Sequence, residues 1–461
     1  MLLVEILVYA ALAASLIIPL LASMGREMSR AILVVSWAGV LSFTLASLTL
    51  LFAGKPVEFY SGLVSHDSFT ALILVGASLS AILVLAAVSL DAYRWPSHPA
   101  FYSLTLLILF GVFYLAGARN ILMVAASWLL VSVASYVTIA LPGDRDSRFA
   151  ALRYVYVGAA ATLLIALWLS AHVYAGGGDL SSTYFTVLPR EPLVSLALTA
   201  ALAAFGFKLG IFPFHWWLPS VYGRADGRPV AVVAGIAKLG FIGLTVRLLV
   251  ESFSGSYEAA LILAVLSALT MTYGNVAALT TTDLQRLLAY SSIAHVGYML
   301  AAMAVALSAL DGQLLKLALA GIALQSIAYT TAKTPLFSIV ADAGRDFERE
   351  LKGLLAGDRA ASISIAILLA SLLGIPPLLG FWGKLYMFIP IAKYSLILLA
   401  IALANSGVSS AYYIRALRNI TASPGEAPGR LHDTYRLSVI LGAFITIVLG
   451  LIAPLALILF L

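Results

Sequence analysis

Long apolar segments recur from one end of this chain to the other, and they constrain its fold more than any other feature. Each is about as long as the ~20 residues that a helix needs to cross ~30 Å of hydrocarbon. The composition agrees, because 62% of the 461 residues are hydrophobic and 10% are charged, whereas soluble domains carry roughly 25% charged residues. The sequence therefore predicts an all-α integral membrane protein.

Hydropathy predicts about fourteen transmembrane helices. No basic region or cleavage site precedes the first span, so we interpret it as a retained helix and not as a signal peptide. Gly374, Pro376 and Pro377 interrupt one span, which is therefore expected to be a broken helix. The predicted spans are 2–22, 31–53, 69–90, 99–117, 120–141, 150–174, 192–211, 229–250, 259–280, 287–308, 314–340, 360–388, 393–416 and 436–460.

The Lys and Arg residues test this topology, because basic residues accumulate in cytoplasmic loops. Of the 27 basic residues, 17 fall in one set of alternate loops and 5 in the other, and 5 lie within spans. The bias predicts that both termini lie outside the cytoplasm of a cell-membrane protein, and it explains the net charge of +6 better than nucleic-acid binding does. The majority set is Arg26, Arg30, Arg94, Arg145, Arg148, Arg153, Arg224, Arg228, Arg286, Arg345, Arg349, Lys352, Arg359, Arg415, Arg418, Arg430 and Arg436.

Lys208 lies deep in an apolar span, five residues before Pro213. A charge at the bilayer centre costs ~2.5–3.5 kcal/mol on insertion scales, and an interior proline costs a helix about 3 kcal/mol. Lys384 similarly follows Pro376 and Pro377. Two interrupted helices in corresponding positions indicate inverted repeats, although two independent kinks are the alternative.

Three more basic side chains lie in the middle of apolar spans: Lys238, His295 and Lys333. Burial favours the neutral form of a lysine, and nearby buried cations titrate together, so such a row can load and pass protons. The histidine ring can carry a proton on either nitrogen. We therefore predict a proton relay through Lys208, Lys238, Lys384, His295 and Lys333, with structurally paired lysines and a packed histidine as the alternative.

The chain has no cysteine, which excludes disulfides and iron–sulfur clusters within it. The six histidines lack metal-ligand spacing. We therefore expect no cofactor, metal or electron-transfer site in this chain.

Three stretches resemble the antiporter-like membrane subunits of respiratory complex I, most closely the subunit N type. They include Gly206-Phe-Lys-Leu-Gly-Ile-Phe-Pro, then Gly274-Asn with Leu287-Leu-Ala-Tyr-Ser-Ser-Ile-Ala-His, and Gly374-Ile-Pro-Pro-Leu-Leu-Gly-Phe-Trp-Gly-Lys. The stretch Asn405-Ser-Gly-Val-Ser-Ser-Ala-Tyr-Tyr-Ile-Arg continues the match. The resemblance covers residues 65–420. It implies fourteen helices, two inverted five-helix repeats, and proton translocation in which Lys208, Lys238, His295 and Lys384 fall on the family's positions. The implied division is 1–98, 99–250, 259–416 and 436–461.

Two positions depart from the subunit N pattern. Leu129 stands where the family has a glutamate that pairs with the lysine at Lys208, so an acid from elsewhere replaces it or proton coupling is altered. The stretch Ala332-Lys333-Thr-Pro is more similar to the L, M and Mrp-type members. The chain ends just after the last span, without a long lateral helix, which argues against the L type.

The resemblance implies a subunit of a redox-driven NADH–quinone oxidoreductase complex. Flavin, iron–sulfur clusters and quinone are then expected in partner subunits, and the expected partners are other membrane subunits, including antiporter-like neighbours, and lipid. Two alternatives stay open. One is a subunit of an Mrp-type Na⁺/H⁺ antiporter, a membrane-bound hydrogenase or an F420H₂ dehydrogenase, and the other is a scaffold subunit that does not pump.

Overall fold

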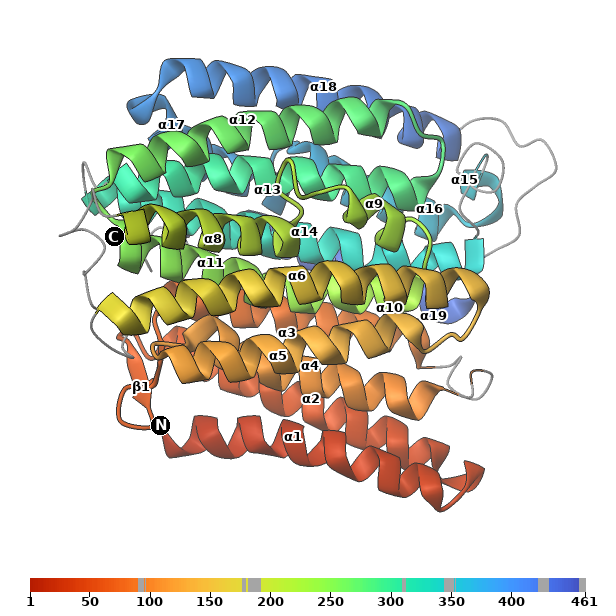
Figure 1. The fold of residues 1–461 in the computed structure, drawn as a ribbon. Coiled ribbons are helices and arrows are strands. Elements are labelled where there is room, and N and C mark those ends of the chain that lie inside the picture. The colour runs from red at the N-terminus through yellow and green to blue at the C-terminus, as the bar shows by residue number, and fades with distance from the viewer. Residues whose placement is uncertain are drawn as a thin grey trace.

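The computed structural model of the protein is a bundle of long helices that run alongside one another (Figure 1). It describes residues 1–89, 95, 97–175, 180, 192–308, 312–343, 352, 354–421 and 431–455. Within these ranges, twelve helices are long and apolar enough to cross a membrane, and Ser195–Leu209 and Arg359–Leu373 are shorter apolar helices. The predicted all-α membrane class is confirmed. The count of fourteen spans and the inverted repeats stay predictions.

The first part of the chain forms six long helices. They are α1 (Leu2–Ser23), α2 (Ser29–Phe52), α3 (Ser68–Val88), α4 (His98–Gly117), α5 (Ile121–Ala140) and α6 (Arg145–Ala175), with a short 3₁₀ turn at Arg26–Met28.

The remaining elements are one helix before the break expected near Pro213, two short helices after it, a π-turn, and further helices of which one has only four residues. They are α8 (Pro192–Leu209), α9 (Trp217–Tyr222), α10 (Gly227–Val232), the π-turn η3 (Val233–Ala237), α11 (Lys238–Phe253), α12 (Tyr257–Leu279), α13 (Leu284–Ser308), α14 (Gly312–Ala343), α15 (Leu354–Gly357), α16 (Arg359–Leu373), α17 (Leu379–Tyr394), α18 (Leu396–Thr421) and α19 (Asp433–Ile452).

A small antiparallel β-hairpin, which hydropathy does not predict, lies between α2 and α3. Its strands are β1 (Val57–Phe59) and β2 (Val64–His66), with Val57 opposite His66. The first residue of α1 lies at the same end of the bundle as this hairpin (Figure 1). The hairpin therefore marks one end of the bundle, which we call the hairpin end.

The chain breaks at both places where glycine and proline predict an interruption. The helix α8 ends at Leu209, and Gly210 follows with φ +79°. The helix α16 ends at Leu373, and Gly374 adopts a left-handed conformation with φ +92° before α17 begins at Leu379. The predicted span 360–388 is thus two helices. These breaks leave helix termini, with free backbone groups, inside the bundle.

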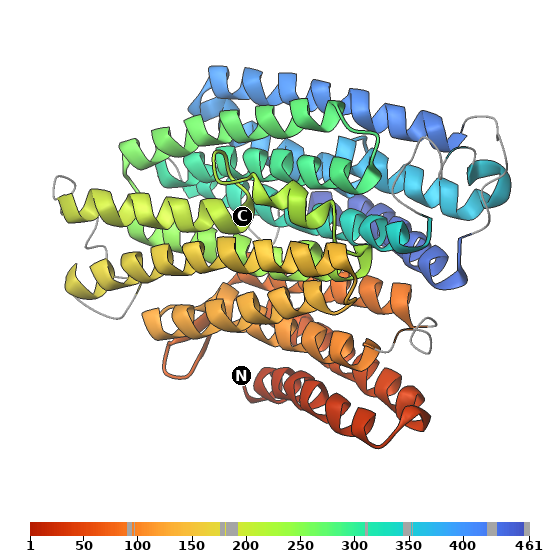
Figure 2. The ribbon, with the colours of Figure 1, turned by 45° about the vertical axis from the view of Figure 1, so that its right-hand side comes forward.

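The centre of the bundle is formed by α11, α13 and α14. Nearly all residues in the apolar windows of Gly227–Phe253 and Leu284–Ser308 are buried, whereas only a minority of those in α1 and α18 are. Two views place α1 and α18 on opposite flanks of the molecule (Figure 2). Side chains on the central helices are therefore shielded from the surroundings of the bundle.

Many basic residues of the majority loop set lie at or near the end opposite the hairpin, where α5 passes into α6 and α12 into α13. Several of the residues used to predict topology, together with one of the minority set, lie outside the described residues: Arg94, Arg190, Arg345, Arg349 and Arg430.

The helices α12 and α13 approach closely because each places a glycine against the other's backbone. A Cβ atom on Gly274 would lie 2.5 Å from the backbone nitrogen of Ala294, and one on Gly297 would lie 2.5 Å from that of Met271. Real Cβ atoms do not approach this closely, so the backbones would have to move apart.

We predict that Gly297→Ala destabilises the protein, because overpacking a tight core costs about 1–3 kcal/mol. The matched control is Gly407→Ala on α18, where a Cβ meets nothing within 4 Å and alanine favours the helix. Thermal unfolding in detergent should give a lower midpoint for Gly297→Ala and an unchanged or higher midpoint for Gly407→Ala. Equal midpoints would contradict the close approach of the two helices.

Candidate functional site

All five side chains predicted to form a relay are buried within the bundle. The exposed fraction is 0% for Lys333, 2% for His295, 3% for Lys238, and 5% for both Lys208 and Lys384. They come from five different elements: α8, α11, α13, α14 and α17. The bundle therefore buries the predicted residues, but it divides them among separate groups of neighbours.

Lys208 lies in the last turn of α8, immediately before the first break. Its Nζ donates a hydrogen bond to Ser132 Oγ (2.7 Å) and another to Tyr136 OH (3.1 Å), both on α5. The carbonyl end of a helix carries a partial negative charge, which favours a cation there. Leu129, where the motif resemblance implies a glutamate, lies about one turn before Ser132 and is 48% exposed.

Lys238 begins α11 directly after the π-turn Val233–Ala237. Single π-turns within helices frequently occur at functional sites. Its Nζ makes no hydrogen bond within the part of the chain that the structure describes. The nitrogen lies 5.5 Å from the ring centroid of Tyr329, so the ammonium group has a cation–π contact with this ring in place of a hydrogen bond.

Lys333 lies on α14 and reaches across to α13. Its Nζ donates to the carbonyl of Leu288 (2.5 Å), to the hydroxyl of Ser291, and to Ser292 Oγ (3.0 Å). It also lies 5.3 Å from the ring centroid of Tyr329, whose hydroxyl donates to Ser292. Tyr329 is thus shared by Lys238 and Lys333, and it joins these two lysines into one group.

His295 lies on α13 between two polar side chains from other helices. Its Nδ1 lies 3.1 Å from Gln325 Nε2 on α14, and its Nε2 lies 3.4 Å from Tyr413 OH on α18. With the amide placed in this way, Nδ1 accepts a hydrogen bond and Nε2 carries the proton toward Tyr413. The ring therefore has a polar neighbour at each nitrogen.

Lys384 lies on α17 just after the second break. Its Nζ donates to the carbonyl of Leu373 (2.8 Å), the last residue of α16, and to Ser406 Oγ (3.0 Å). A Cβ on Gly374 would lie 3.0 Å from Lys384 Cδ. The break thus leaves the carbonyl of Leu373 free to accept a hydrogen bond from the ammonium group. The absence of a side chain at Gly374 leaves room for the aliphatic chain of Lys384.

A cluster of amide and hydroxyl groups fills the space beside Lys384. Asn275 donates to Tyr298 OH and to Asn405 Oδ1, both at 3.1 Å, and it accepts from Tyr412 OH at 2.9 Å. The ring centroid of Tyr298 lies 5.3 Å from Lys384 Nζ. Tyr412 precedes Tyr413, the partner of His295, so polar groups extend from the histidine toward Lys384.

Hydropathy alone does not identify these neutral polar partners. Polar side chains within apolar spans are the signal that could have found them, since each is costly to bury without a hydrogen bond. The residues in question are Ser132, Tyr136, Asn275, Ser291, Ser292, Tyr298, Gln325, Tyr329, Asn405, Ser406, Tyr412 and Tyr413.

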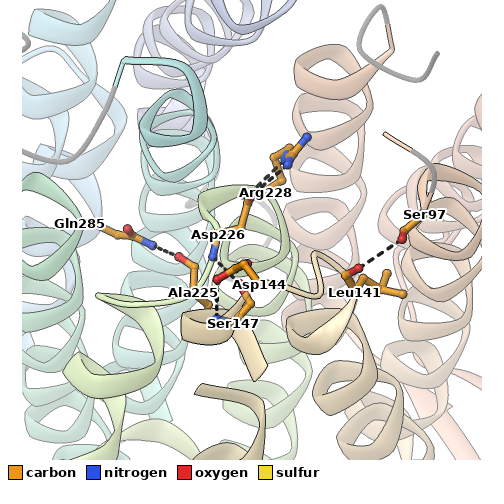
Figure 3. Close-up of polar contacts among 8 residues, drawn as sticks. All are labelled: Ser97, Leu141, Asp144, Ser147, Ala225, Asp226, Arg228 and Gln285. Carbon is orange, nitrogen blue, oxygen red and sulfur yellow. Dashed lines mark hydrogen bonds and ion pairs between the residues drawn. The ribbon is translucent and has the colours of Figure 1, made fainter. Parts of the chain in front are cut away.

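Polar contacts also gather at the end of the bundle opposite the hairpin, where loops meet (Figure 3). The backbone nitrogen of Asp226 donates to Ser147 Oγ, and Gln285 Nε2 donates to the carbonyl of Ala225 at 2.7 Å. Partial burial of Asp144 raises its pKa, but hydrogen bonds, chiefly from the side chain and backbone of Ser147, outweigh this effect and hold that pKa below its usual value. Asp144 is therefore a charged group at this surface.

At the hairpin end, His66 in β2 is buried beside Arg247. Burial first, and then the charge of Arg247, lowers the pKa of His66 to about 3. Arg247 pairs with Asp67 at 3.6 Å, and Arg119 pairs with Glu251 at 3.8 Å. The imidazole therefore stays neutral at ordinary pH, and two ion pairs lie at the same end of the bundle.

No group of three or more potential metal ligands occurs among His, Asp and Glu within the described ranges. The polar contacts around the buried lysines come instead from hydroxyl, carbonyl and amide groups and from aromatic faces. Such groups can hold an ammonium ion or a neutral amine, so the arrangement can accept and release protons.

Three comparisons bear on the family. Residues 118–410 match the family model described as NADH:quinone oxidoreductase/Mrp antiporter, TM. A protein named NADH-quinone oxidoreductase subunit N 2, from Solidesulfovibrio magneticus, is 33% identical over 344 residues, which cover 72% of this chain and 71% of the relative.

Solved structures agree. A chain of respiratory complex I from Thermus thermophilus, solved with bound aureothin, has a TM-score of 0.80 and 29% identity, with 98% of both chains covered. A chain of the Mrp complex from a Dietzia species has a TM-score of 0.86 at 18% identity, covers 100% of this chain and 96% of its own, and supports the fold alone. The resemblance inferred from the motifs is confirmed, and this chain belongs to the membrane family of NADH:quinone oxidoreductases and Mrp antiporters.

Proposed function

We propose that this chain is a proton-translocating membrane subunit of a redox-driven complex of the NADH–quinone oxidoreductase type. Protons move within it along Lys208, Lys238, Lys333, His295 and Lys384. The family membership supports the class of function, and the buried basic side chains support the residues.

The observation that carries the proposal is the chemistry around the buried lysines. Within the described residues, none of the ion pairs includes Lys208, Lys238, Lys333 or Lys384. A buried charge without a counter-ion is costly, and cations on neighbouring helices repel one another. Each added proton therefore discourages the next, which couples the protonation of one lysine to that of its neighbours.

The contacts suggest an order for the relay. The ring centroid of Phe241 lies 4.7 Å from Lys208 Nζ, and Phe241 is on α11, the helix that carries Lys238. The ring of Tyr329 lies beside both Lys238 and Lys333. From there, polar groups continue past His295 and the Asn275 cluster to Lys384. Motion of water and side chains would complete the steps between these groups.

The same proposal includes an orientation in the cell membrane. The end opposite the hairpin faces the cytoplasm, and both termini lie on the outer side. The support is the excess of arginine near that end, which follows the positive-inside rule; examples are Arg145, Arg224, Arg286 and Arg415.

Electron transfer belongs to partner subunits in this proposal. Flavin, iron–sulfur clusters and quinone would be bound there, and this chain would contact other membrane subunits, including antiporter-like neighbours, and lipid. The support is the relatives, which are named as subunits of quinone oxidoreductases or belong to respiratory complexes. The chain itself has no cysteine to hold a cluster.

A second candidate is a subunit of an Mrp-type antiporter, a membrane-bound hydrogenase or an F420H₂ dehydrogenase. The Ala332-Lys333-Thr-Pro stretch favours it. Purification of the native complex separates the candidates, because co-purifying quinone-reductase, hydrogenase or other antiporter subunits each identify one of them. A scaffold that does not pump is favoured by Leu129 alone and opposed by four buried lysines.

We predict that Lys208→Ala leaves the complex assembled and active in electron transfer but removes much of its proton pumping. The reason is that alanine cannot carry a proton between α8 and its neighbours. Proton uptake per electron in proteoliposomes is the measurement, with Lys55→Ala, an exposed loop variant, as the control. Unchanged pumping by Lys208→Ala would exclude Lys208 as a relay.

We predict that Leu129→Glu extends pumping to higher pH, because a carboxylate near Lys208 favours its charged form. The alkaline limb of the pH profile should move upward, and Leu129→Gln, which adds no charge, should leave it in place. An identical profile for both variants and the parent would argue that position 129 does not act on Lys208.

A further inference from the structure

Three aromatic rings surround the ammonium group of Lys208. Its Nζ lies 4.7 Å from the ring centroid of Phe241 and 5.2 Å from those of Trp128 and Tyr136. A cation over an aromatic face within about 6 Å of its centroid is attracted by the ring quadrupole, and the attraction is strongest where water is excluded. Among the described residues, Lys238, Lys333 and Lys384 each have one such ring, so Lys208 differs from the other buried lysines.

Contacts among the rings hold them in place. Trp128 donates from Nε1 to Thr162 Oγ1 at 3.0 Å, and it packs edge-on against Phe241 at 5.0 Å between centroids. Tyr136 packs edge-on against Tyr154 at 4.8 Å. The rings therefore belong to the packed core between α5, α6 and α11, and contacts other than the lysine fix their orientation.

A glycine makes the room that the hydroxyl of this group needs. A Cβ on Gly158 of α6 would lie 1.7 Å from Tyr136 OH. That hydroxyl is one of the two that accept hydrogen bonds from Lys208, and Ser132 provides the other. The lysine thus has two oxygen acceptors and three aromatic faces, and no carboxylate pairs with it within the described residues.

We propose that Trp128, Tyr136, Phe241 and Ser132 form an aromatic ammonium site that stabilises the protonated form of Lys208 in place of a carboxylate. These four are positioning residues, which act through the lysine. The proposal deepens the relay role and rests on the proposed function for its meaning in transport. It accounts for Leu129, because a lysine held by ring quadrupoles and hydroxyls does not need an acid on α5.

The choice of neutral partners has a consequence for coupling. A carboxylate can itself take up the proton or pair with another cation, whereas ring quadrupoles and a serine hydroxyl keep their charge distribution throughout the cycle. The charge state of this group therefore depends on Lys208 alone, and any control must come from neighbouring cations or from changes in hydration.

The test measures the protonation of Lys208 directly in the purified complex. The infrared ammonium band that disappears in Lys208→Gln is assigned to Lys208, and the pH of its half-loss is then determined in each variant. Phe241→Leu should lower that pH by about one unit, a tenfold change in the protonation equilibrium, and Phe241→Tyr, which keeps the ring, should restore it. Tyr136→Phe, which keeps the ring and removes the hydroxyl, should lower it by a smaller amount.

The matched control is Phe205→Leu. Phe205 is as buried as Phe241 and also packs on Trp128, with 6.1 Å between ring centroids, but it is not among the rings that face Lys208 Nζ. If Phe241→Leu shifts the half-loss and Phe205→Leu does not, the aromatic site is supported. Equal effects of the two variants, or no shift with Phe241→Leu and Tyr136→Phe, would overturn it and leave the rings as packing.

The infrared readout also separates this proposal from the relay itself. Should Lys208→Ala pump normally, the relay role fails, while the band of Lys208 still reports whether the rings stabilise its charge. A normal half-loss in every ring variant, together with lost pumping in Lys208→Ala, would instead remove the aromatic site and keep the relay.

Discussion

The burial of basic side chains among helices is the constraint on which the rest of this structure depends. An ammonium group within a bundle needs acceptors, and regular helices use their own carbonyl groups internally. The second break meets this need for Lys384, and two hydroxyl groups on α5 meet it for Lys208 beside the first break. Lys208 lies at the carbonyl end of α8, and Lys384 donates to the last carbonyl of α16. Each break therefore lies next to a lysine whose ammonium group has hydrogen-bond acceptors there.

The four buried lysines are held in different ways, which suits different positions in the proposed relay. Lys333 and Lys384 have backbone carbonyl and hydroxyl acceptors, Lys208 has hydroxyls and three rings, and Lys238 has one ring and no hydrogen bond within the described chain. Lys238 has the weakest support for a charge. In the proposed relay, a proton would therefore stay longer on neighbouring groups than on Lys238.

Departure from the family pattern at Leu129 has a physical counterpart in the structure. The leucine is 48% exposed, while Ser132 and Tyr136, about one and two turns later on the same face of α5, carry no charge but accept hydrogen bonds from Lys208. The partner of the lysine on this helix is thus neutral. Under the proposal of an aromatic ammonium site, hydroxyls and aromatic faces take the place of the acid beside this lysine.

The sequence by itself determined the membrane class, the places of the breaks and the basic residues that would be buried. The length of an apolar run, and the proline and glycine within it, determine the local backbone structure. A lysine in the middle of such a run lies within the membrane and usually faces the interior of the bundle. Only the tertiary structure decided the partners: Ser132 is 76 residues from Lys208, and Gln325 is 30 from His295. Hydropathy also missed the hairpin, whose short strands carry no long apolar signal. Which helix faces which depends on close packing across the whole bundle, and no local pattern encodes it.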